Sequence, residues 1–198
     1  LYAAVSSAML QFGQLDEWLA ATAKAGAAPA VRFSSAFPFY RDTLFVEPPK
    51  SHWPPPPSAK VRWKGARFVP LSVVEALVAE KHLDEERWMV DGESECLIPA
   101  GSSARVLGPF RTAVRRCAAV DRLTGASVEP HETACLEFRA GAGLWAMTVF
   151  EDQDAENRWG ELVKAAFRLL ADSGFGGERS RGWGHAAAPE FTEGEFPA

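Results

Sequence analysis

The chain has 198 residues, of which 47% are hydrophobic and 24% charged, and its formal net charge is −5. This composition excludes disorder as the main state and allows one well-filled core or two small ones. No apolar run approaches the roughly 20 residues needed to cross a bilayer, and the apolar opening over residues 1–10 lacks the basic region of a signal peptide. We therefore expect a cytoplasmic protein with no membrane partner.

The N-terminal part reads as a helical segment followed by an extended one. Because the chain begins with Leu rather than Met, inside a helical pattern, we expect an N-terminal segment to be missing. Apolar residues are dense and glycine and proline are few over residues 2–28, which predicts a helix that Pro29 ends. Residues 31–57 are extended and rich in proline. Since proline has no amide donor, we expect a loop or an edge there rather than a central strand.

A strand, a short helix and an insertion are expected next. Residues 61–69 predict a basic strand, and residues 71–79 predict a short helix with Ser72 at its N-cap. Residues 81–108 are polar and contain glycine, and we expect an insertion or a projecting hairpin there.

Two strands and a helix are expected towards the C-terminus. Residues 134–139 alternate between apolar and polar, and residues 144–150 form an uninterrupted apolar run, which predicts a hairpin whose second strand is covered on both faces. Residues 159–170 have the apolar spacing of an amphipathic helix, with Asp152 or Asp154 as N-cap candidates and Gly174 as its left-handed C-terminal cap. This order predicts an α+β fold, for which the ferredoxin-like arrangement is the commonest solution.

No metal or other cofactor is expected. The three cysteines, Cys96, Cys117 and Cys135, form no CxxC pair, so we expect reduced, structural thiols. His131 and Cys135 have the spacing of two ligands on a helical face, but their surroundings read as strand. Asp152 and Asp154 look like a helix N-terminus rather than a metal site.

The distribution of charge is uneven along the chain. An acidic protein is at first sight a poor partner for nucleic acid, because phosphate binding is largely electrostatic. Basic residues nevertheless gather in three segments that contain almost no acidic ones, namely Lys60, Arg62, Lys64 and Arg67, then Arg105, Arg111, Arg115, Arg116 and Arg122, then Arg179 and Arg181. The chain can therefore present a basic groove on an acidic body, with ordinary solvated charged faces as the alternative.

The most informative motif is Gly-Phe-Gly-Gly-Glu-Arg-Ser-Arg-Gly-Trp-Gly over residues 174–184. Glycine at this density costs backbone entropy, and close approach of the backbone to a phosphate chain is one reason for it. Bare amides, the guanidinium groups of Arg179 and Arg181 and the hydroxyl of Ser180 can all donate to phosphate oxygens, and Phe175 and Trp183 can stack on bases. A tight turn with no ligand remains the alternative. The loop is not a P-loop, because its glycines follow a helix and no Gly-Lys-Ser/Thr occurs.

Placed directly after a helix, this motif resembles the glycine-rich loop of the RAMP superfamily of CRISPR proteins. Three further segments resemble one branch, the fourth subunit of the type III-A (Csm) effector. They are Ser-Ser-Ala-Phe-Pro-Phe with the following Pro-Pro-Lys over residues 34–50, the basic stretch 60–70, and Val-Asp-Arg-Leu-Thr-Gly over residues 120–125. The resemblance covers roughly residues 31–71 and 111–184. Ser35 stands where the family has an aspartate.

The resemblance implies an α+β fold of ferredoxin-like, RRM-like domains, two in number, the first incomplete at its N-terminus. We expect an N-terminal region over residues 1–110, with a thumb candidate at residues 81–110, and a C-terminal region over residues 111–198. It also implies a non-catalytic subunit that binds the 5′ tag of the CRISPR RNA. Its expected partners are the large polymerase-like signature subunit, the backbone RAMP subunits and, indirectly through the thumb, target RNA.

The candidate RNA-binding residues follow from carrying the family's motifs over to this sequence. The glycine-rich loop contributes Gly176, Gly177, Arg179, Ser180, Arg181, Gly182 and Gly184. Arg122 is expected beside the loop as an RNA contact that Asp121 orients. A basic track that binds the RNA backbone adds Arg111, Arg115, Lys50, Lys60 and Lys64.

The alternative function is a metal-independent CRISPR RNA-processing endoribonuclease of the same superfamily. Such chemistry needs a general base and a cation that stabilises the transition state. His185, beside the loop and near Arg181 in sequence, is the candidate base. Because no second catalytic partner stands out, we expect no catalytic residues.

Overall fold

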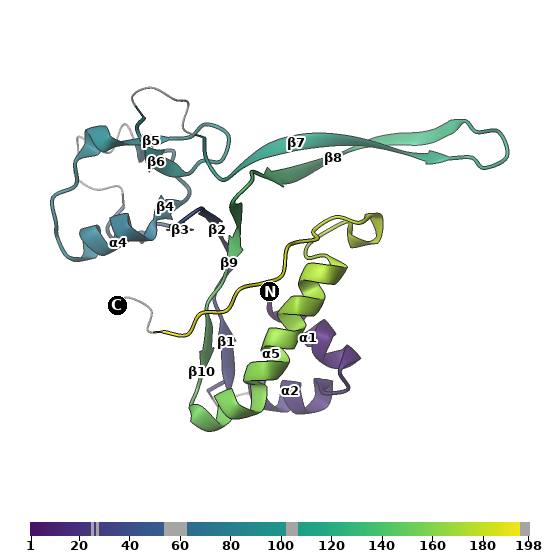
Figure 1. The fold of residues 1–198 in the computed structure, drawn as a ribbon, viewed down its shortest axis with the longest axis horizontal. Coiled ribbons are helices and arrows are strands. Elements are labelled where there is room, and N and C mark those ends of the chain that lie inside the picture. The colour runs from purple at the N-terminus through teal and green to yellow at the C-terminus, as the bar shows by residue number, and fades with distance from the viewer. Residues whose placement is uncertain (25, 27, 54–62, 102–106, 195–198) are drawn as a thin grey trace. The chain divides into compact units, whose positions relative to one another are not determined.

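The computed structural model describes residues 1–24, 26, 28–53, 63–101 and 107–194 (Figure 1). Its contacts divide the chain into two compact units. Unit 1 combines Leu1–Ala36 with Ala146–Phe196, and unit 2 consists mainly of Phe37–Trp145. This division differs from the expected boundary at residue 110, because the strands on either side of unit 2 in sequence pair with each other. The expected α+β class is confirmed: helices combine with small antiparallel sheets.

Unit 1 begins with two helices rather than the single helix expected over residues 2–28. They are α1, Tyr2–Gln11, and α2, Leu15–Thr22. The break falls at Gly13, whose φ of +69° lies in the left-handed region that a helix cannot continue through. The amide of Gln14 then donates to Met9 O at 2.9 Å, so the turn that ends α1 leads directly into α2.

The rest of unit 1 is a two-stranded antiparallel sheet and one long helix. Strand β1, Val31–Phe33, pairs with β10, Thr148–Phe150. Helix α5, Gln153–Ser173, begins at Asp152, whose carboxylate accepts from the amide of Ala155 at 2.8 Å, as one of the two expected N-caps. Gly174 ends α5 with φ +89° and ψ 144°, so its φ is positive as expected but its conformation is not the left-handed helical one.

The core of unit 1 lies between its three helices and β1. Trp18, fully buried, meets the ring of Trp159 edge-on at 5.3 Å, and its indole nitrogen donates to Ser6 Oγ. The apolar positions of α5 predicted from sequence, among them Val163, Ala166 and Leu170, are buried in this cluster. Amphipathic spacing therefore located the buried face of α5 correctly.

Unit 2 is built on a four-stranded antiparallel sheet in the order β4-β3-β2-β9. The strands are β2, Phe37–Tyr40; β3, Thr43–Val46; β4, Val69–Pro70; and β9, Ala142–Trp145. The expectation that prolines keep this region out of a central strand is wrong, because β2 carries Pro38 and lies between two strands. The pairing of β2 with β3 starts only at Phe39, so Pro38 lies just beyond the end of this ladder.

The indole of Trp145 replaces the amide that Pro38 lacks. Continuing the register of β2 and β3 by one pair places Phe45 opposite Pro38. Trp145 Nε1 donates to the carbonyl oxygen of Phe45 at 3.0 Å. This side-chain hydrogen bond satisfies a largely buried carbonyl, since Phe45 is only 2% exposed.

We expect Trp145→Phe to destabilise unit 2 by about 1–3 kcal/mol, because it leaves a buried carbonyl without a donor. Pro38→Ala restores an amide at that place and should offset much of the loss. The measurement is a double-mutant cycle by urea denaturation. An equal cost of Trp145→Phe with Pro38 and with Ala at position 38 would contradict this account of the strand.

The expected elements around residues 61–79 are partly corrected. Trp63 is helical and fully buried rather than part of a strand, and the strand is confined to β4. Lys60 and Val61 lie outside the described residues. Helix α4 spans Leu71–Val78, but its N-cap is Pro70, so Ser72 lies inside the helix and makes no cap.

The described residues of the segment 81–110, namely 81–101 and 107–110, pack within unit 2 rather than projecting from it. A 3-10 turn at Glu85–Arg87 precedes β5, Trp88–Val90, which pairs with β6, Leu97–Pro99. Leu97 and Ile98 are buried in two hydrophobic clusters of this unit.

The long projecting hairpin is formed by β7, Phe110–Val120, and β8, Ser127–Phe138. Most of its residues beyond Phe110 are exposed, and Figure 1 shows its distal part as an isolated ribbon. The expected hairpin between residues 134–139 and 144–150 is wrong. The first segment pairs with β7, and the second is divided between β9, which pairs with β2, and β10, which pairs with β1.

A compact polar turn anchors the base of this hairpin. Asp91, 7% exposed, accepts from the amide and the hydroxyl of Ser94 at 2.9 and 2.7 Å. Gly108 packs against this turn, and its carbonyl accepts from Arg139 Nε at 3.0 Å, while Arg139 also pairs with Glu93 at 2.5 Å. These contacts therefore hold the start of β7 and the end of β8.

Candidate nucleic-acid interface

The glycine-rich loop of unit 1 is closed at its base by backbone contacts. The amide of Phe175 donates to the carbonyl of Gly184 at 3.0 Å. A Cβ at Gly184 would lie 2.1 Å from Phe175 O, and a Cβ at Gly174 would lie 2.4 Å from Trp183 O. Both glycines have positive φ, so only glycine fits at the two ends of the loop.

The apex of the loop has the opposite character. Gly176, at φ +102°, and Gly182, at φ +82°, have no atom within 4 Å of the place where a Cβ would stand, and neither does Gly177. Between them, Glu178 adopts a left-handed conformation and Arg179–Arg181 form a 3-10 turn. Gly174 and Gly184 therefore close the loop. The other three glycines leave the backbone of the apex unobstructed, so another molecule can approach it closely.

The two arginines of the loop differ in their partners. Arg181 is ion-paired with Glu178 at 3.0 Å. Arg179 has no ion pair among the described residues, and it lines a concavity together with Ser173, Gly176, Glu178 and Ser180. This makes Arg179 the better placed of the two to pair with a phosphate. The Glu178–Arg181 pair was missed in the sequence, although its i, i+3 spacing is a signal for it.

Asp121 and Arg122 lie at the tip of the β7–β8 hairpin in unit 2. Asp121 accepts from Leu123 N at 2.9 Å and Thr124 Oγ1 at 2.7 Å, and these hydrogen bonds hold the pKa of its carboxyl below the usual range. Its role in the structure is thus to shape the turn. Arg122 is exposed, and Leu123 is 96% exposed. That these residues lie beside the glycine-rich loop stays a prediction, since it joins residues of the two units.

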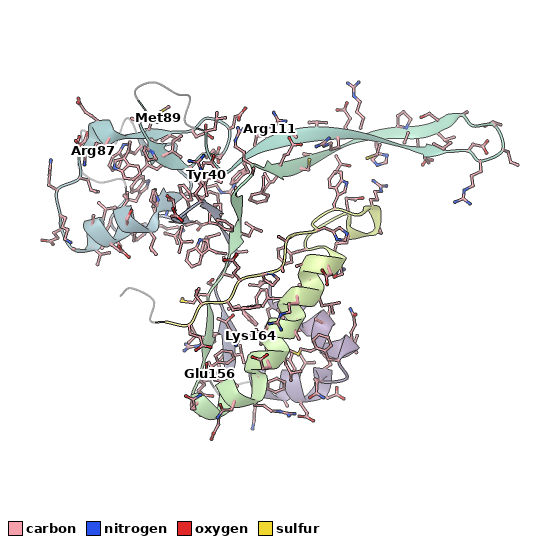
Figure 2. The ribbon with its side chains drawn as sticks, viewed as in Figure 1. Tyr40, Arg87, Met89, Arg111, Glu156 and Lys164 are labelled. Atoms are coloured by element: carbon pink, nitrogen blue, oxygen red, sulfur yellow. The ribbon has the colours of Figure 1, made fainter. Side chains whose placement is uncertain are left out.

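Arg111 and Arg115 on β7 share one acidic partner. Both pair with Glu137 of β8, Arg111 through Nη2 at 2.6 Å, and Figure 2 shows Arg111 at the base of the hairpin. The hydrogen bond from Arg111 is the main reason that the pKa of Glu137 is lowered. These arginines are partly neutralised, which weakens their case as phosphate contacts. Once β7 is known to pair with β8, the opposite charges of Arg111 and Glu137, which face each other in the register, indicate this ion pair.

The remaining candidates lie outside the loop, and those that the structure describes are exposed. Lys50 and Lys64 are exposed in turns of unit 2, and Lys60 lies outside the described residues. His185 follows the loop and is exposed.

No group of three or more potential metal ligands occurs among the described residues. Burial raises the pKa of the Cys96 thiol to about 11, which makes it unreactive.

Within the described part of the chain, no helix is long and apolar enough to span a membrane.

Known proteins resemble the chain in structure. No family model matches it, and no curated protein matches it in sequence. A chain in the crystal structure of the Csm3–Csm4 subcomplex of the type III-A CRISPR-Cas interference complex superposes with a TM-score of 0.61 at 12% identity, over 89% of this chain and 58% of that one. Chains in crystal structures of the Csm1–Csm4 cassette with cA4 and with AMPPNP give TM-scores of 0.53 and 0.51 at 15% and 17% identity, over 86% and 85% of this chain.

These identities establish likeness of fold, and the chain spans 58% of the length of the chains that it matches. Csm4 is the component that the three structures share. The resemblance read from the sequence is therefore confirmed as a likeness of fold: the chain shares its fold with chains in crystal structures that contain Csm4, one of them from a type III-A CRISPR-Cas interference complex.

Proposed function

We propose that the chain is a non-catalytic subunit of a type III CRISPR effector complex and holds the 5′ tag of the guide RNA in its glycine-rich loop. The observation that carries this proposal is the division of the loop into a fastened base and an open apex, with Arg179 beside the exposed backbone and without an ion pair among the described residues. A loop that served only to reverse the chain would need its glycines at the base alone.

The chemistry of the apex suits a phosphate chain. The amides of a turn with alternating left- and right-handed residues form a concave donor surface for anions. Arg179 and Ser180 add a charge-assisted and a neutral donor beside it. Since none of these groups reads a base edge, the loop would bind the backbone of the tag in a sequence-tolerant way.

Further parts of the proposal concern domains and partners. The small antiparallel sheets with packed helices support a ferredoxin-like fold within each unit. The β7–β8 hairpin, rather than residues 81–110, takes the place of the thumb, because it is the exposed ribbon. Structures of like fold hold Csm4 together with Csm1 or with Csm3, which supports docking of a large signature subunit and of backbone RAMP subunits.

Replacing Arg179 by alanine tests the proposed role of the loop. We expect RNA carrying the 5′ tag to bind at least about tenfold more weakly, since a hydrogen bond to a charged group contributes about 1.5–3 kcal/mol. The measurement is fluorescence anisotropy of labelled RNA with the purified chain and with the assembled complex. Arg87→Ala is the matched control, because Arg87 is an exposed arginine of unit 2 outside every candidate site. Equal affinities for the Arg179 and Arg87 variants would count against the loop.

The non-catalytic character is tested by incubating the chain with tagged precursor RNA and resolving the products on a gel. We expect the RNA to remain intact. Specific cleavage products that disappear with His185→Ala would instead support the endoribonuclease.

A further inference from the structure

The segment that follows the glycine-rich loop runs back along α5. The amide of Ala186 donates to Ala171 O at 3.1 Å, the ring of Phe191 lies 6.4 Å from that of Phe167, and Glu193 lies 3.8 Å from Lys164. The contacts move towards the start of α5 as the chain proceeds, so residues 186–194, which we call the tail, lie antiparallel to α5. Figure 1 shows the tail as the yellow segment without helix or strand.

The tail covers a basic and aromatic stripe on α5, which we define as Lys164, Phe167 and Arg168. Residues at i, i+3 and i+4 share one face of a helix. The guanidinium of Arg168 lies 5.3 Å from the centre of the Phe191 ring, and the ring of Phe167 meets the same ring edge-on. Phe191 thus lies against both an aromatic ring and a cation.

The tail reproduces the contacts that a single-stranded nucleic acid makes. Such strands stack bases on aromatic rings and arginine planes and place phosphates on cations. The contact of Phe191 with Arg168 is of the kind that a stacked base makes, and the contact of the Glu193 carboxylate with Lys164 is of the kind that a phosphate makes. The tail sequence Pro-Glu-Phe-Thr-Glu-Gly carries no basic residue, so its charge complements the stripe.

The tail is held weakly enough to be displaced. Phe191 is 39% exposed and the side chain of Glu193 is 84% exposed. Lys164 has a closer partner in Glu161, at 3.0 Å, and exposed ion pairs contribute little to stability. The free energy needed to displace the tail by another polyanion is therefore small.

The stripe also lies on the path that leads to the loop. Helix α5 ends at Ser173 and the glycine-rich loop begins at the next residue. At 1.5 Å per residue, Arg168 is about 9 Å along the helix from Gly174. A strand bound at the loop can continue onto α5 without leaving unit 1.

We propose that Lys164, Phe167 and Arg168 form a second RNA-binding segment, adjoining the loop, and that the acidic tail occupies it until RNA displaces it. This inference rests on the proposed function, because the RNA is the same strand that the loop binds.

The test compares the full chain with Phe191→Ala/Glu193→Gln, which opens the stripe. Affinity for a labelled single-stranded RNA is measured at roughly 50 to 300 mM salt, where phosphate binding depends strongly on the salt concentration. We expect the open variant to bind about tenfold more tightly at low salt, because RNA no longer has to displace Phe191 from Arg168 and Glu193 from Lys164. The slope of log K against log salt should stay nearly unchanged, because Lys164 and Arg168 meet phosphates in both proteins.

Two further variants separate the stripe from general charge effects. Glu190→Gln is the control, since Glu190 is an exposed tail carboxylate without an ion pair among the described residues; it should leave affinity and slope nearly unchanged. Adding Lys164→Gln/Arg168→Gln to the open variant should weaken binding and flatten the slope by about 1.4, because two cations no longer meet phosphates. Circular dichroism checks that each variant remains folded.

The outcomes distinguish this inference from the function on which it rests. If Arg179→Ala weakens RNA binding but opening the tail leaves the affinity unchanged and removing the two cations of the stripe leaves the slope unchanged, the loop binds RNA and the stripe does not. If Glu190→Gln tightens binding as much as the open variant does, the tail acts only through bulk charge, and the inference is overturned. If neither the unmodified chain nor the open variant binds RNA, both proposals fail.

Discussion

Replacing Gly184 by alanine is expected to disrupt the glycine-rich loop and abolish RNA capture. The new Cβ would lie 2.1 Å from the carbonyl oxygen and 2.7 Å from the amide nitrogen of Phe175, both backbone atoms that cannot turn away. The residue would also have to hold φ at +78°. The left-handed conformation costs about 1–2 kcal/mol and overpacking about 1–3 kcal/mol, so we expect a loss of roughly 2–5 kcal/mol, measured by urea denaturation.

Gly177→Ala is the matched control for this substitution. A Cβ at Gly177 meets nothing within 4 Å, and its φ is not positive. The variant should therefore fold as stably as the unmodified chain. If the apex backbone approaches RNA, however, Gly177→Ala should still weaken RNA binding. Stability lost equally in both variants would show that the loop has no fastened base.

Replacing Gly108 by alanine is expected to have a comparable effect in unit 2. The Cβ would stand 1.9 Å from Ser94 Oγ and 2.6 Å from Asp91 Oδ2. Ser94 is only 2% exposed, so the turn has no space to move into. We expect a loss of about 3 kcal/mol from overpacking, together with loss of the hydrogen bond from Arg139 to the Gly108 carbonyl, which positions the β7–β8 hairpin.

Ser94→Gly provides the compensating variant. It removes the hydroxyl and the Cβ that clash with Ala at position 108, at the cost of the hydrogen bond to Asp91. In a double-mutant cycle, Gly108→Ala should therefore cost much less with Gly at position 94 than with Ser. A cost that does not depend on residue 94 would mean that Gly108 is required for some other reason.

The candidate RNA-binding residues could be chosen from the sequence by residue type, but their roles depend on contacts that only the structure shows. The glycine-rich loop stood out in the sequence by composition and by its place after a helix. The sequence grouped Gly184 with Gly176, Gly177 and Gly182 as RNA contacts, whereas in the structure Gly184 closes the loop together with Gly174 and the other three are open. Arg111 and Arg115 were candidates as parts of a basic track, but both pair with Glu137, which the sequence did not reveal.

From the sequence alone, we could predict the α+β class, the helix α5 with Asp152 or Asp154 as its N-cap, the position of the loop and the resemblance to the Csm4 branch. The choice between the two N-caps and the pairing of the strands required the three-dimensional contacts. Residues 134–138 join β7 rather than residues 144–150, and Pro38 lies in an inner strand because Trp145 donates in place of its amide. The physical reason is that periodicity records which face of an element is buried. The partner that buries it is chosen by contacts between residues far apart in the chain, which a local pattern does not contain.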